Sequence, residues 1–186
     1  NAEAAQQVTM RSHDVRATIV GEVAKTQLTT TFFNAGSLSV TGDFRLAIPE
    51  GAIVSRFATD RGSYVREAHL ALAARGQETI VPDQAVLEWA GEGWVRGTIP
   101  SIASGATVKV IVEYTEWLSP RPKPGSSNLV LQYRYPMAAD SAPPQIGDFY
   151  ARVDAMGSAP ISMAAGLGAT VSGGVVELRR PDFKPT

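Results

Sequence analysis

The 186-residue sequence predicts an all-β fold, a mostly antiparallel β-sandwich with at most one short helix. The strongest indication lies in residues 99–118, where a turn rich in Pro, Ser and Gly precedes a strict alternation of apolar and polar side chains. Lys109 and Glu113 face away from the apolar positions, whereas Ile111 interrupts the polar face, so we expect that face to be partly covered. The apolar positions of this predicted central strand are Val108, Val110, Val112 and Tyr114.

Turn residues give the second indication. The chain contains 17 Gly and 12 Pro, which separate short alternating runs along its whole length. Roughly ten short strands with turn signals between them are typical of an antiparallel sandwich.

Four strands are expected before residue 61. The first alternates Val15, Ala17 and Ile19 with polar residues, and the second is rich in threonine, which favours extended structure. The second ends at a turn signal that begins with Asn34. The four expected ranges are 15–19, 22–33, 44–48 and 53–60.

Residues 64–75 allow two interpretations. Ala and Leu favour a helix with Leu70 and Ala74 on one stripe, but the helical pattern is incomplete. A strand that continues past the turn at Gly62 is the alternative, and both interpretations stay open at this point.

Alternation resumes after Pro82. Residues 119–127 form a loop that is stiff in its Pro-rich part and flexible in its Gly-Ser part. Strands are expected on either side of this loop, at 86–89, 94–99, the central strand, 129–135, 149–153, 160–163 and 175–178.

Composition limits the classes of function. The length fits one domain, or one domain with a small addition. The 17 basic and 18 acidic residues leave a net charge of −1 without a basic stripe, so we expect no nucleic-acid partner. No apolar run approaches the ~20 residues that span a bilayer, so we expect no membrane insertion by this segment. The absence of cysteine excludes disulfides but not secretion.

Three segments together resemble a known family. EVAKTQLTTTFFN ends in a Phe–Asn pair. FRLAIPEGAIVSRFA carries a spaced set at Phe44, Pro49, Gly51, Ala52, Val54 and Phe57. IPSIASGATVKVIVEYTEWL carries another at Ile102, Gly105, Val108, Val110, Tyr114 and Leu118. In this order, these segments resemble the VIT domain of vault proteins and inter-alpha-trypsin inhibitor heavy chains.

The resemblance also has departures. REAHLALAARGQET keeps Glu67-Ala68 of a family segment but lacks its charge density and tyrosine, and Ser104 replaces a proline before Gly105. These changes leave the expected fold intact but weaken any function tied to that loop.

The resemblance implies a domain organisation. Residues 8–118 form a VIT-like β-sandwich core, residues 119–127 a loop, and residues 128–183 additional strands that complete or extend the sandwich. A linker over residues 179–185, with Asp182-Phe183 as its lead-in, would then join a downstream von Willebrand A domain. The metal-site signature of that domain, D-x-S-x-S, is absent from these residues, and both chain ends resemble those of an excised piece.

The resemblance implies a non-catalytic protein-interaction and scaffolding module of a larger bacterial-type VIT/von Willebrand A protein. An extracytoplasmic location, periplasmic, surface or secreted, is the expectation. The alternative function is a carbohydrate-binding β-sandwich module that uses exposed aromatic residues. A flat, exposed aromatic platform would distinguish the two.

Three tryptophans are the candidate partner-binding residues: Trp89, Trp94 and Trp117. An indole offers a large contact area at low entropy cost, although core packing is the competing interpretation. Trp117 faces opposite Tyr114 in the central strand, so we expect it to be the exposed one.

The histidines do not indicate a catalytic or metal site. His13 and His69 lie far apart without spaced ligand partners, and zinc requires about four N or S ligands. We expect both to be surface or turn histidines, with no catalytic residue, metal or cofactor. No G-x-S-x-G elbow occurs, and the glycine-rich run around Gly166 and Gly168 precedes a predicted strand rather than a phosphate-binding helix.

Overall fold

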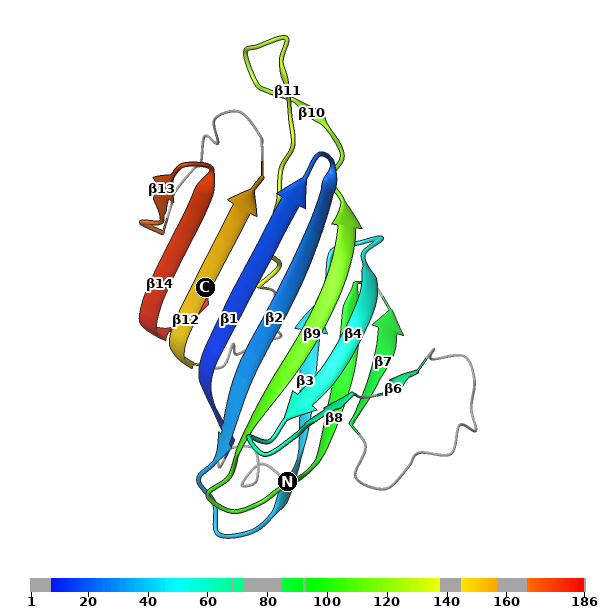
Figure 1. Ribbon diagram of the computed structural model, residues 1–186, viewed down its shortest axis with the longest axis vertical. Helices are drawn as coiled ribbons and strands as arrows, with labels where there is room; N and C mark the ends of the chain where they lie inside the picture. The colour runs from blue at the N-terminus through cyan, green and yellow to red at the C-terminus, as the bar shows by residue number, and fades with distance from the viewer. Residues whose placement is uncertain are drawn as a thin grey trace.

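The computed structural model describes residues 8–67, 69–71, 85–91, 93–137, 145–156 and 167–185, with side chains except those of residues 69–71, 86, 88–91 and 100. The chain within these ranges forms strands that build two sheets and a hairpin (Figure 1). The strands are β1 (Val8–Val20), β2 (Val23–Asn34), β3 (Val40–Ala47), β4 (Ile53–Asp60), β5 (Val65–Glu67), β6 (His69–Ala71), β7 (Val86–Gly91), β8 (Trp94–Ile102), β9 (Thr107–Trp117), β10 (Arg121–Pro122), β11 (Leu129–Val130), β12 (Ile146–Ala155), β13 (Thr170–Ser172) and β14 (Val175–Phe183).

The predicted all-β, mostly antiparallel fold is confirmed. The large sheet has the order β13-β14-β12-β1-β2-β9-β4-β5, and its strands pair antiparallel except β1 with β12. The small sheet has the order β3-β8-β7-β6, with β6 and β7 parallel. The described residues contain no helix, and hence none that is long and apolar enough to cross a bilayer.

The predicted face of β9 is confirmed. Val108, Val110, Val112 and Tyr114 are at most 2% exposed, whereas Ile111 is partly covered on the opposite face, as expected. The strand is interior to the large sheet, with β2 on one side and β4 on the other. Its buried face packs toward the small sheet, which Figure 1 shows behind β9 and β4.

Two segments differ from the sequence expectation. Within residues 64–75, the described parts are the strands β5 and β6, so the helical interpretation is wrong there. The strand expected at 129–135 extends only over β11, because its tyrosine side chains, and not its backbone, bind the large sheet.

The C-terminal region also differs in part. Strand β14 continues to Phe183 and pairs with β12 along most of its length, so residues 179–183 are strand where a linker was expected. The strand expected at 160–163 and Gly166 lie outside the described residues.

A buried asparagine joins the two sheets. Asn34, at the end of β2, is fully buried, and its Nδ2 donates to the carbonyl oxygens of Leu38 (2.8 Å), Ile102 (2.9 Å) and Ala103 (3.2 Å). Its Oδ1 accepts from the backbone N of Gly36 at 2.9 Å. One side chain therefore satisfies groups in both the β2–β3 and the β8–β9 connections, two of the connections that pass from one sheet to the other.

We predict that replacing Asn34 destabilises the whole fold. Asn34→Ala removes the fully buried amide and takes a donor from one buried and two partly buried carbonyls, so it should lower the free energy of unfolding by about 2–4 kcal/mol. Asn34→Asp keeps the volume but loses the amide donors, so it should be similarly damaging. Urea unfolding measures both, with the exposed-turn variant Asn128→Ala as a control. Wild-type stability of Asn34→Asp would contradict the role of the donors.

A second prediction tests the faces of β9. Val110→Asp places an unpartnered carboxylate in the core and should cost several kcal/mol, out of a total of about 5–15 kcal/mol, so the variant should be insoluble or unfolded. Lys109→Gln removes only an exposed ion pair with Asp60 (3.5 Å) and should change stability by less than about 1 kcal/mol. If the two variants melt at the same temperature, the assigned faces are wrong.

Candidate functional site

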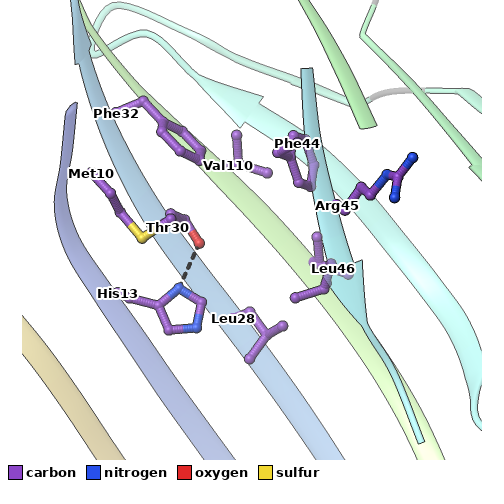
Figure 2. A pocket seen from close by; sticks show the side chains of 10 residues that line it. Met10, His13, Leu28, Thr30, Phe32, Phe44, Arg45, Leu46 and Val110 are labelled. Atoms are coloured by element: carbon purple, nitrogen blue, oxygen red, sulfur yellow. Dashed lines mark hydrogen bonds between the residues drawn. The ribbon is translucent and has the colours of Figure 1, made fainter. Parts of the chain in front are cut away.

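The inner face of the large sheet contains a recess where the small sheet ends. It has a volume of about 70 Å³ and lies between strands β1, β2 and β9 on one side and β3 on the other (Figure 2). Its lining is mainly apolar and consists of Met10, His13, Leu28, Thr30, Phe32, Phe44, Arg45, Leu46, Val110 and Val112.

Strand periodicity accounts for most of this lining. His13 lies two residues before the buried Val15, so the same side of β1 carries both inward. Phe44 belongs to the edge strand of the small sheet and lies over Gly97 of β8, its partner in the register. A Cβ atom at Gly97 would overlap the Phe44 ring, so this position requires glycine.

His13 is a buried residue and not the surface or turn histidine that the sequence suggested. It is 7% exposed, and its Nδ1 lies 2.8 Å from Thr30 Oγ1, directly across the β1–β2 pair. Its Nε2 lies 2.6 Å from Tyr135 Oη, and its ring stacks on Phe149 at 6.1 Å. The burial of His13 was not expected because this residue precedes the apolar alternation of residues 15–19 that indicates the strand. The parity with Val15 was the available signal.

Tyrosines from residues 131–137 cover the same inner face. Tyr133 Oη lies 2.9 Å from Thr26 Oγ1 of β2, and Tyr135 Oη binds His13 of β1 further along the sheet. Beside them, Tyr114 Oη faces Thr26 and Tyr133, and Glu116 Oε1 has no hydrogen bond to a described residue. Burial raises the pKa values of all three tyrosines and of Glu116, so these groups favour their neutral forms.

The chemistry of this recess is that of a structural polar cluster. Burial lowers the pKa of His13 to about 4, so the imidazole is neutral at pH 7, with one nitrogen as donor and the other as acceptor. Both nitrogens already face hydroxyl groups, which leaves neither available as a general base. Within the described ranges, no three His, Cys, Asp or Glu side chains come together in a possible metal site.

The predicted tryptophans are not brought together by the described part of the fold. Trp117 ends β9 in the large sheet and is 66% exposed, as expected. Trp94 starts β8 in the small sheet and is half-buried. Trp89 lies in β7, and its side chain falls outside the described residues, as does that of His69.

We predict that His13 makes the protein sensitive to acid. Because the folded pKa of about 4 lies below the ordinary value of 6.5, the unfolded chain binds the proton more readily between these values. The contribution of the neutral His13 to stability is therefore fully present above pH 6.5. Protonation of this group alone should lower the free energy of unfolding by about 2 kcal/mol from pH 7 to pH 5.

Denaturant unfolding of three proteins at both pH values measures this effect. His13→Gln should lose the histidine-dependent part of the decrease. Tyr135→Phe removes a hydrogen-bond partner but keeps the buried imidazole, so it should retain that part. An equal decrease in wild-type and His13→Gln protein would contradict the prediction.

Solved structures resemble the chain at low sequence identity. A candidate nutrient-binding protein from Legionella pneumophila is 13% identical, with a TM-score of 0.53, over 96% of this chain and 64% of its own. An M1 zinc metallopeptidase variant from Deinococcus radiodurans is 15% identical, with a TM-score of 0.49, over 95% of this chain and 39% of its own. A two-domain M1 zinc metallopeptidase variant bound to L-tryptophan is 14% identical, with a TM-score of 0.49, over 95% of this chain and 40% of its own. The chain thus spans about 40% of the metallopeptidase chains.

The family comparison is more specific. No curated protein matches the chain. The vault protein inter-alpha-trypsin (VIT) domain matches residues 10–114, which contain most of β1, all of β2 to β8, most of β9 and the buried Asn34. This match covers more than half of the sequence and contains the first two of the three segments that resemble the family, and the third up to Tyr114. The chain therefore belongs to the VIT domain family.

Proposed function

We propose that this VIT domain is a non-catalytic protein-interaction and scaffolding module of a larger extracytoplasmic protein that also carries a von Willebrand A domain. The observation that carries the proposal is the division of side chains between the inside and the outside. Polar groups of the inner face bind one another, as His13 does with Thr30 and Tyr135. A large aromatic side chain, Trp117, is presented to solvent instead.

The same division supports a non-catalytic role. A catalytic histidine needs a nitrogen that can exchange a proton with a substrate. In His13 both nitrogens are engaged within the fold, and the ring is held by Phe149. The recess beside it offers mainly apolar contact, which suits packing.

The carbohydrate-binding alternative receives less support. Sugar recognition through stacking requires aromatic faces that share one exposed surface. Trp94 and Trp117 lie in different sheets and differ in exposure, and neither takes part in the ring contacts found among the described residues. Saturable quenching of Trp117 fluorescence by an oligosaccharide would revive this alternative.

The C-terminal strand supports a contact with a neighbouring domain. β13 pairs with β14 only from Val175 to Glu177, although β14 continues to Phe183. The backbone edge beyond Glu177 therefore has no strand partner among the described residues, and Arg179 to Asp182 are exposed. A free edge of this kind is a surface on which another domain can pack.

We predict that the downstream domain protects this edge. Sequencing the gene past Thr186 should reveal an α/β domain with a D-x-S-x-S metal site. Hydrogen exchange by mass spectrometry, compared between the isolated chain and the longer protein, should then be slower over residues 178–185 in the longer protein.

Peptides from β5, the opposite edge of the large sheet, are the internal control and should exchange alike in both. A stop codon soon after Thr186, or identical exchange of residues 178–185 in both proteins, would contradict the scaffolding proposal.

A further inference from the structure

One end of the molecule collects exposed apolar side chains from strands that are distant in sequence. Val20, at the end of β1, pairs with Val23, which in turn pairs with Trp117, so the three lie in one row across the large sheet. Val20 is 61% and Trp117 66% exposed. Met156 is bound to this end through its backbone N, which donates to the carbonyl of Ile19, and it is also exposed.

The β10–β11 hairpin extends from the same end. It begins four residues after Trp117, and Leu118 holds its base through a 2.7 Å hydrogen bond to the carbonyl of Glu22 in the β1–β2 turn. Figure 1 shows the hairpin projecting beyond the ends of the large-sheet strands. Residues 119–132 are exposed throughout, including Leu129 (65%) and Leu131 (40%). The described part of the fold thus leaves these leucines in water.

The charge of the hairpin has one sign. Between Trp117 and Met137 the sequence contains Arg121, Lys123 and Arg134 and no acidic residue. Arg121 and Lys123 are exposed, and the ion pairs of the described residues do not include them. Glu22 is an exposed acidic residue in the adjoining turn. The hairpin itself therefore suits an anionic partner.

We propose that this end docks on the surface of an anionic phospholipid membrane. Leu129, Leu131 and the Trp117 indole would lie among the lipid headgroups, with the cations of the hairpin on the phosphates. The docking is peripheral and requires no spanning element.

The shape of the hairpin favours lipid over a protein partner. Arg121 pairs with Val130 and Pro122 with Leu129 in a ribbon of two short strands, and exposed apolar side chains lie on both of its faces. A deformable lipid surface covers both faces of such a projection at once, whereas a protein would need a matching cleft. The net charge of −1 does not indicate this site, because acidic residues elsewhere in the chain offset the cations of the hairpin.

Vesicle sedimentation of the purified chain tests the proposal. The chain should pellet with vesicles of equimolar phosphatidylcholine and phosphatidylglycerol, and much less with phosphatidylcholine alone. Raising the salt from about 0.1 M to about 1 M should weaken binding, because the Debye length falls from about 10 Å to about 3 Å. Tryptophan emission should shift to shorter wavelength on binding, and Trp117→Phe should abolish this shift.

Matched variants locate the surface. Leu129→Ser/Leu131→Ser should lower the partition coefficient by about tenfold or more. Arg121→Gln/Lys123→Gln should lower it and reduce its salt dependence. Leu38→Ser/Val65→Ser changes comparably exposed apolar residues outside this end of the molecule and should bind like the wild type. The substituted residues are exposed, so unchanged melting temperatures should accompany all three variants.

Three results would overturn the proposal. These are no pelleting with anionic vesicles, equal pelleting of the wild type and the leucine variant, and equal binding to neutral and anionic vesicles. If the chain does not pellet with anionic vesicles but an acidic amphipathic peptide shifts the emission of Trp117, the surface docks a protein instead of a membrane. The proposal goes beyond scaffolding, and a negative vesicle result leaves the exchange experiment on β14 unaffected.

Discussion

The two-sheet architecture depends on the amide of Asn34. A sandwich needs its connections to cross from one sheet to the other, and these crossings leave backbone carbonyls, such as that of the buried Ile102, outside the strand ladders. Asn34 donates to three carbonyls in two of these connections, β2–β3 and β8–β9, and accepts from a fourth backbone group. Because the connections on either side are bound to one fixed side chain, β3 and β8 are held against the inner face of β9. The recess beside β3 is a consequence of that position.

Two parts of the chain cover the inner face of the large sheet. The small sheet covers β9 and β4, whereas residues 131–137 bind β1 and β2 through tyrosine hydroxyls. The extended segment adds no strand to the sheet, so its attachment depends on a few directional contacts between buried polar groups. Such clusters are stabilising only when their members are satisfied, and protonation of His13 would remove an acceptor. Acid sensitivity and the ordering of this segment are therefore linked by one imidazole.

The outer surface differs from the inner face because it exposes apolar and cationic side chains to solvent. Where β1 and β9 end and β2 begins, apolar side chains remain exposed, and the hairpin that extends beyond them carries cations. The inner cluster explains how the fold is held together. The proposed contacts use this end and the edge of β14 that has no strand partner among the described residues. The two proposed contacts use separate elements, so one molecule has room for a membrane contact and a neighbouring domain at the same time.

The sequence by itself determined the local features, because side-chain alternation reports a strand directly. It predicted the two faces of β9, the bounds of β4, the exposure of Trp117 and, by three spaced segments, the family. It failed where the deciding contact is distant in the chain. Tyr133 and Tyr135 alternate like a strand, yet their partners are Thr26 and His13, more than a hundred residues away. The recess and the apolar end likewise exist only after folding, because the strands that form them are assembled by tertiary contacts that no local pattern encodes.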